Sequence, residues 1–93
     1  MKKHLSVTVT EYMKSSDDVF EAFYACLEFP EWFGFNWDAF WDSLHDFQWD
    51  ESIEKIDIYI KAWPSLPEKD LEIFKSLMHE LDYEMVTVHF PDE

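Results

Sequence analysis

Three segments of the chain alternate apolar and polar side chains with the period of two that is typical of a β-strand. Residues 5–10 alternate leucine and valine with serine and threonine. Residues 53–61 contain an isoleucine at every second position of their second half, and residues 85–90 form the third apolar segment. The sequence therefore predicts three strands, one near each end and one just beyond the middle.

Two other segments space their apolar residues three and four positions apart, as on the buried side of a helix. The first follows Ser16, a residue suited to cap a helix, and we expect Pro30 to end it. The second opens at Pro67, because proline is favoured at the start of a helix. Their predicted buried sides are formed by Val19, Phe20, Phe23, Tyr24 and Leu27 in the first, and by Leu71, Ile73, Phe74, Leu77, Met78 and Leu81 in the second.

A third helix is predicted for residues 37–47, with Asn36 as its N-cap and Gly34 in the turn before it. Its apolar stripe consists of Trp37, Phe40, Trp41 and Leu44. Carboxylates recur at i, i+4 and i+8 on another face, at Asp38, Asp42 and Asp46. Like charges at this spacing repel, and only the first lies beside the positive end of the helix dipole. A solvated face and a binding surface both explain this acidic ladder.

Eight aromatic side chains fall within residues 32–49, more than one short helix and its entry turn can bury on one side. We assign Phe40 and Leu44 to the core and expect Trp32 to be exposed. Aromatic side chains beside carboxylates suit a partner rich in arginine and lysine. The predicted partner-binding residues are Trp32, Phe33, Gly34, Asn36, Trp37, Asp38, Trp41, Asp42, His45 and Asp46.

The order of the predicted elements is strand, helices, strand, helix, strand. This order predicts an α/β fold with a three-stranded parallel sheet, on which three or four helices pack as crossovers. With 93 residues, one glycine and four prolines, the chain leaves little room for linkers. We therefore expect a single domain over residues 1–93.

The formal charge of -14 argues against direct binding to nucleic acid or to anionic membranes, because like charges repel. It predicts a basic protein partner. General solubility, a saline environment and mimicry of nucleic acid explain the same charge, and composition alone does not separate them.

Cysteine content and hydrophobic runs indicate the compartment. The single Cys26 cannot form an internal disulfide, and its apolar neighbours place it in the predicted core. No apolar run is long enough for a membrane span or a signal peptide. We therefore expect a cytoplasmic protein.

The sequence contains no pattern specific to an enzyme: there is no glycine-rich phosphate loop, nucleophile elbow or cysteine pair. An open alternative is a divalent ion held by Asp42 and His45, with Asp38 or Asp46 nearby and His79 as a second element. Adjacent carboxylates bind metal weakly unless a second element closes the site. We predict no cofactor, no metal and no catalytic activity.

Residues 29–44 read FPEWFGFNWDAFWDSL. The proline and acid, the two aromatics, the glycine, and the asparagine and aspartates at their spacing resemble the signature of the barstar family, intracellular inhibitors of the secreted ribonuclease barnase. The order of elements in that family, a three-stranded parallel sheet with helices packed on it, agrees with the pattern described above.

The resemblance implies that the central helix and the turn before it plug the active site of a ribonuclease. It implies that Asp42 takes the place of a substrate phosphate and that Asp38 is a second acidic contact. It also implies that Trp32 packs on the catalytic histidine of the enzyme. The remaining contacts of the family map onto Gly34, Asn36 and Trp41.

The chain departs from the family pattern on its last helix, where Ser76 stands at the position of an interface glutamate and Glu72 and Glu80 lie one turn away. Tryptophan also replaces a tyrosine at Trp32. These differences predict a divergent paralogue tuned to a different nuclease. We expect a monomeric immunity protein that binds a basic ribonuclease or nuclease toxin one to one. The alternative is an acidic mimic of nucleic acid that binds a basic DNA-binding or regulatory protein.

Overall fold

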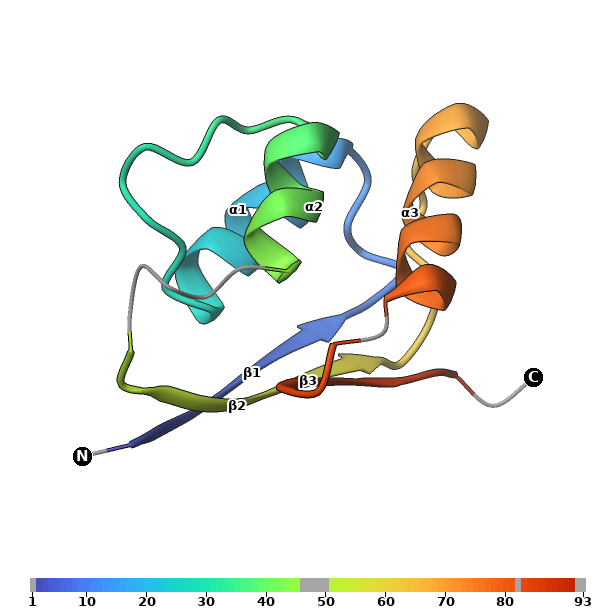
Figure 1. Ribbon diagram of the computed structural model, residues 1–93. Coiled ribbons are helices and arrows are strands. Elements are labelled where there is room, and N and C mark those ends of the chain that lie inside the picture. Colours follow the sequence, from blue (N-terminus) through green and yellow to red (C-terminus); the bar gives the residue numbers. More distant parts are fainter. Residues whose placement is uncertain (1, 46–50, 82, 92–93) are drawn as a thin grey trace.

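The computed structural model describes residues 2–45, 51–81 and 83–91. Six elements follow one another: β1 (Lys3–Val9), α1 (Ser16–Cys26), α2 (Trp37–His45), β2 (Ile53–Ile60), α3 (Glu68–Glu80) and β3 (Val86–His89). The strands form one parallel sheet in the order β1-β2-β3, and the three helices lie on one of its faces (Figure 1). The predicted three-stranded parallel α/β fold is confirmed.

The sheet turns its β-branched residues toward the helices. Val7 and Val9 on β1 pair with Ile58 and Ile60 on β2, and all four are buried. The register shifts between Lys3 and His4, so that the β2 side of the pair carries one extra residue. This bulge lets both Ile53 and Ile56 face the core although they are three positions apart.

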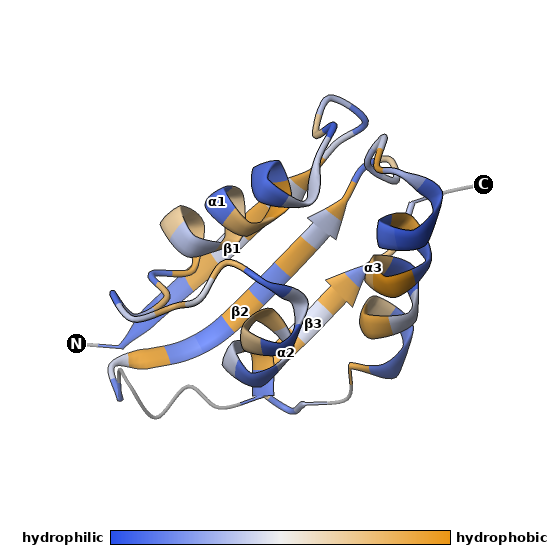
Figure 2. Cartoon of the chain, turned by 90° about the horizontal axis from the view of Figure 1, so that it is seen from above, coloured by the Kyte–Doolittle hydropathy of each residue, from blue (hydrophilic) through white to orange (hydrophobic). Residues whose placement is uncertain are grey.

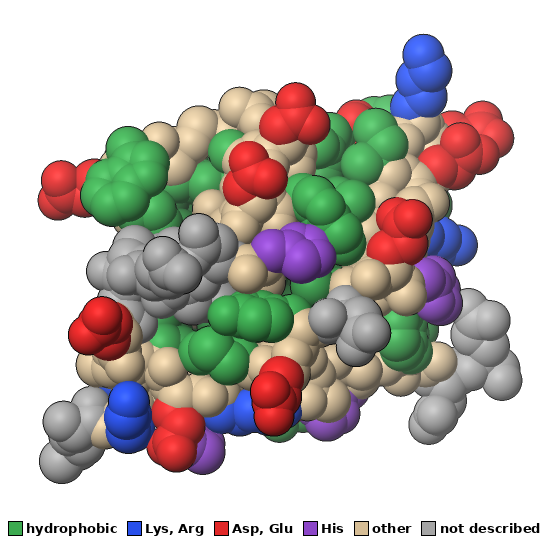
Figure 3. Space-filling model, in the orientation of Figure 1, with side chains coloured by type: hydrophobic (Ala, Val, Ile, Leu, Met, Phe, Trp, Pro, Cys, Tyr) green, Lys and Arg blue, Asp and Glu red, His purple; other side chains and the backbone are tan. Residues whose placement is uncertain are grey.

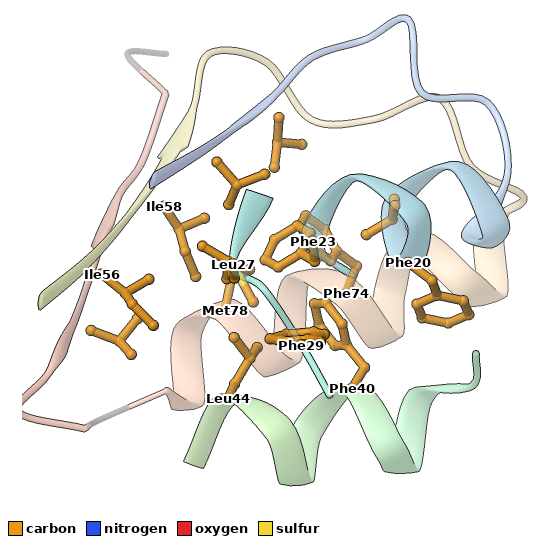
Figure 4. Close-up of a cluster of buried hydrophobic side chains, with 14 of the residues drawn as sticks. Phe20, Phe23, Leu27, Phe29, Phe40, Leu44, Ile56, Ile58, Phe74 and Met78 are labelled. Atoms are coloured by element: carbon orange, nitrogen blue, oxygen red, sulfur yellow. The ribbon is translucent and has the colours of Figure 1, made fainter. Parts of the chain in front are cut away.

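Aromatic side chains from all three helices meet above the sheet. Phe23 from α1, Phe40 from α2 and Phe74 from α3 are fully buried, and their rings contact one another edge to face or tilted. Figure 4 shows them together with Ile56 and Ile58 of β2. The view onto the helices shows α1 along β1 and α3 along β3, with α2 between the two (Figure 2). The core therefore fixes α2 from both sides.

The other face of the sheet carries polar residues in the described part of the chain. Ser6 and Thr8 on β1 are exposed, and Asp57 on β2 forms a hydrogen bond with His89 on β3 (Oδ1 to Nε2, 2.9 Å). Parallel sheets are usually covered on both faces. Here a polar outer face replaces the second layer.

The ends of α1 differ from the sequence prediction. Ser15, rather than Ser16, caps the helix, because its hydroxyl accepts the backbone N–H of Asp18. The helix ends at Cys26, before Pro30 is reached, and the backbone N–H of Leu27 donates to Phe23. Glu28 then adopts a left-handed conformation (φ 54°), which turns the chain out of the helical path.

Two predicted burials were wrong. Cys26 is exposed because it is the last helical residue, at the edge of the stripe that buries Phe23 and Leu27. Ile73 was placed on the buried side of the last helix, but it is 38% exposed. Phe74 and Met78 point to the core, and Ile73 lies about 100° around the helix from Phe74.

Some predictions about the central helix fall on undescribed residues. The helix was expected over residues 37–47, and α2 is described from Trp37 to His45. The end of that prediction, and the assignment of Asp46 to the binding surface, lie outside the described residues. Within the described ranges, no helix has the length and apolar character needed to cross a membrane.

Candidate partner-binding site

The start of α2 is fixed by Asn36, as the sequence predicted. Its side-chain Oδ1 accepts the backbone N–H of Ala39 (2.8 Å), and its carbonyl accepts the N–H of Phe40 (3.0 Å). Gly34 has no positive φ, so its requirement is one of space. A Cβ atom at that position would lie 3.1 Å from Nδ2 of Asn36. Glycine therefore lets the turn approach the helix cap closely.

A tight turn before α2 separates two neighbouring aromatics. The backbone N–H of Phe33 donates to the carbonyl of Pro30 (2.9 Å), which closes the turn. Phe33 points inward and is 6% exposed, and its ring packs on Phe29 (centroids 5.0 Å apart). Trp32 points outward and is 78% exposed. The turn therefore presents one large aromatic side chain to solvent and anchors itself with the other.

A small hollow of about 180 Å³ joins this turn to α2. Its walls are formed by Pro30, Trp32, Phe33, Gly34, Ala39, Asp42 and Ser43. Residues ten positions apart, Trp32 and Asp42, thus share the rim of one depression. Figure 3 shows acidic side chains over α2 and a large hydrophobic side chain over the turn to its left.

Asp38 and Asp42 are exposed on successive turns of α2. Among the described residues, neither carboxylate forms a hydrogen bond or an ion pair. Asp38 lies in the first turn, where the helix dipole favours a negative charge, whereas Asp42 lies beyond it. Asp42 therefore combines an uncompensated charge with an adjacent aromatic wall, an arrangement suited to a cationic group.

Trp37 faces the interior. Its ring packs edge to face on Phe20 (4.8 Å) and Phe40 (5.5 Å), and its Nε1–H donates to Oδ1 of Asp70 on α3 (3.1 Å). It is half-buried. Trp37 therefore holds α2 against α3, on the side of the helix away from Asp42 and the hollow.

The last turn of α2 pairs Trp41 with His45. The imidazole Nδ1–H donates to the carbonyl of Trp41 (2.9 Å), and the two rings lie 3.8 Å apart at 69°. Both side chains are half-buried. The bond orients the histidine back along the last turn of the helix.

The whole of this arrangement lies within a match to a known family. A family model described as Barstar (barnase inhibitor) matches residues 4–87. The chain belongs to the barstar family. Among curated proteins, none matches the chain. The family match runs from β1 into β3 and includes the turn and α2, where the residue pattern of the barstar family was found in the sequence.

In this barstar-family chain, four of the predicted residues are exposed on the turn and on α2, and we call them the α2 surface: Trp32, Gly34, Asp38 and Asp42. The half-buried Trp41 lies beside His45 in the last turn of the helix. The other predicted residues are placed differently. Phe33 is in the core and Trp37 faces α3, so they support the surface from beneath. Asn36 is exposed but uses its Oδ1 as the helix cap. His45 lies at the far end of α2.

Sequence reasoning missed two contributions. Asp70 on α3 fixes Trp37, and Pro30, Ala39 and Ser43 complete the hollow. Ala39 carried a usable signal, because a small residue one turn before Ser43 leaves room for a depression between larger neighbours. The bond to Asp70 depends on how α3 packs, which no local pattern encodes.

The metal hypothesis needs at least three ligands in one place. Within residues 2–45, 51–81 and 83–91, no group of three histidine, cysteine, aspartate or glutamate side chains is placed to hold an ion. Asp46, which the hypothesis offers as a further ligand beside Asp42 and His45, lies outside these ranges.

Proposed function

We propose that the protein is a stoichiometric inhibitor of a barnase-type ribonuclease and that it blocks the active site of the enzyme with the α2 surface. The observation that carries this proposal is Asp42, exposed and unpaired within the described residues, on the rim of a hollow shared with Trp32. Membership of the barstar family supports the same reading.

The chemistry of the rim favours a planar cation. An arginine or a protonated histidine of the enzyme can stack on the exposed face of Trp32 and donate hydrogen bonds to Asp42. These are the residue types that a ribonuclease uses to bind and cleave a phosphodiester. Asp42 then occupies the position of a substrate phosphate, and Asp38 neutralises a second cation on the next turn of the helix.

The charge of the whole chain supports rapid binding. With a formal charge of -14, the protein attracts a basic enzyme over about a Debye length, roughly 8 Å at physiological salt. Complementary fields mainly raise the association rate, and added salt lowers it. We place this function in the cytoplasm, where an immunity protein meets a ribonuclease toxin before it cleaves cellular RNA.

The test is RNA cleavage by barnase titrated with this protein, at low and at moderate salt. We expect complete inhibition at one equivalent. Asp42→Asn keeps the volume of the side chain and removes its charge, and we expect it to raise the concentration for half-inhibition at least tenfold. Asp17→Asn is the matched control, because it removes one exposed charge from α1. We expect it to change that concentration less than twofold.

Two results would overturn the proposal. Inhibition by Asp42→Asn at wild-type strength excludes the α2 surface as the plug. Equal and small losses for Asp42→Asn and Asp17→Asn indicate a diffuse acidic mimic of nucleic acid, in which no single carboxylate is privileged.

A further inference from the structure

Glu28 holds a backbone conformation that glutamate rarely adopts. Within residues 2–45, 51–81 and 83–91 it is the one non-glycine residue with a positive φ, at 54°. This left-handed region is sterically unfavourable for a residue with a Cβ atom, and after a helix it is usually occupied by glycine. Such strain persists where the surrounding structure holds the residue in place, most often near a functional site.

The strained residue directs the chain out of α1. Leu27 is the C-cap of the helix and Glu28 follows it, and the backbone N–H of Phe29 donates to the carbonyl of Tyr24 (3.1 Å). This is the bond of a Schellman motif, which places the residue before Phe29 in the left-handed region. The motif turns Phe29 into the core, where it is 5% exposed.

An ion pair holds the same point from outside. Nζ of Lys3, the first residue of β1, lies 2.8 Å from Oε1 of Glu28. The two side chains are 38% and 45% exposed, so the pair contributes little to the stability of the whole fold. It does join the start of the sheet to the end of α1, 25 positions apart on the chain. Glycine would relieve the strain, but it has no side chain to make this connection.

The turn that carries Trp32 begins directly after this point. Phe29 packs on Phe33 (ring centroids 5.0 Å apart), and the N–H of Phe33 closes the turn on the carbonyl of Pro30 (2.9 Å). Trp32 lies between these anchors and is 78% exposed, so its direction depends on how the turn leaves α1. The rim that Trp32 shares with Asp42 depends on the same geometry.

We infer that Glu28, through its ion pair with Lys3, is a positioning residue for Trp32 in ribonuclease binding. This inference rests on the proposed function and gives Glu28 no contact with the enzyme. The pair holds the turn in the orientation that sets Trp32 beside Asp42 before the enzyme arrives, so that less conformational freedom is lost on binding. The strained backbone is retained because the ion pair needs a side chain at this position.

The experiment measures the Kd for barnase and the urea midpoint of the same variants. Glu28→Gly removes both the strain and the pair, and we expect its Kd to rise about threefold while its midpoint stays unchanged or rises. Lys3→Gln should raise the Kd by a similar factor, although it makes the chain more acidic. Glu28→Gln has a matched control in Glu54→Gln, because Glu54 is also exposed and pairs with a residue of β1, His4. We expect about a threefold rise for the first and less than about 1.5-fold for the second.

A double-mutant cycle separates positioning from contact. In a Trp32→Ala background, Glu28→Gly should leave the Kd almost unchanged, because the side chain that it positions is gone. An undiminished effect in that background would overturn the inference, since Glu28 would then act independently of Trp32. A lower urea midpoint for Glu28→Gly would also overturn it, because the weaker binding would then accompany a loss of structure.

The remaining outcomes distinguish this inference from the function on which it rests. Wild-type affinity of Glu28→Gly, or equal losses for Glu28→Gln and Glu54→Gln, overturns the positioning role. If Asp42→Asn still weakens binding in that case, the inhibitor function stands. Failure of the wild-type protein to bind barnase overturns both.

Discussion

Phe40 links the two roles of α2, because it lies on the same helix as the acidic surface but points to the core. It is fully buried, and four aromatic rings surround it: Phe23 at 4.8 Å, Trp37 at 5.5 Å, Phe20 at 5.8 Å and Phe74 at 6.3 Å between centroids. Truncation to alanine leaves a cavity among rigid rings that cannot collapse into it. We therefore expect Phe40→Ala to destabilise the protein strongly.

The magnitude follows from burial and packing. A buried Phe→Ala change costs about 3–5 kcal/mol, and poor relaxation of the cavity favours the upper half of that range. A chain of 93 residues has a free energy of unfolding of about 5–14 kcal/mol, at roughly 0.05–0.15 kcal/mol per residue. The change therefore removes at least about a fifth of that free energy of unfolding, and nearly all of it at the low end of the range.

The assay is urea unfolding followed by circular dichroism and tryptophan fluorescence. With a slope of about 1–1.5 kcal/mol/M, the midpoint of Phe40→Ala should fall by about 2–5 M. Trp32→Ala is the control on the exposed side, and its free energy of unfolding should change by less than about 0.5 kcal/mol. A loss below about 1.5 kcal/mol for Phe40→Ala, or equal losses for both variants, would refute the assignment of Phe40 to the core and of Trp32 to the exposed surface.

Three further changes test the local interactions, each by urea unfolding. Asn36→Ala removes the side-chain cap of α2 and should cost about 1 kcal/mol, while a cost near zero would mean that the cap is dispensable. Glu28→Gly relieves the left-handed backbone at the end of α1, which should stabilise the protein by about 1 kcal/mol. The same change loses an exposed ion pair with Lys3, which contributes at most about 1 kcal/mol. We therefore expect an unchanged or higher urea midpoint. Trp37→Phe loses the hydrogen bond to Asp70 and should cost about 1 kcal/mol, with less than additive loss when combined with Asp70→Ala.

The fold was readable from the sequence because its signals are local and strong. Alternation in β1 and β2 and the helical spacing around Phe23 and Phe74 each determine one element, and parallel strands require the helical crossovers between them. Errors occurred where two neighbours compete for one role. Ser15 and Ser16 are equally good caps on paper, and only the bond to Asp18 decides between them.

The candidate site was readable in composition but not in orientation. Adjacent aromatics such as Trp32 and Phe33 look alike in sequence, and the bond from Phe33 N–H to Pro30 decides which one faces solvent. The exposure of Ile73 could not be predicted, because the exposure of a stripe residue depends on how the neighbouring helices pack rather than on spacing. Tertiary packing assigned these roles.

The central claim is that the α2 surface occupies the active site of the ribonuclease. The most direct measurement is the affinity of this protein for barnase in increasing concentrations of a non-hydrolysable dinucleotide that fills that active site. We predict that the apparent Kd rises in proportion to the dinucleotide concentration, because both ligands compete for the same phosphate-binding cations. An apparent Kd that stays constant while the dinucleotide saturates the enzyme would contradict the claim, since it would place the inhibitor elsewhere on the enzyme.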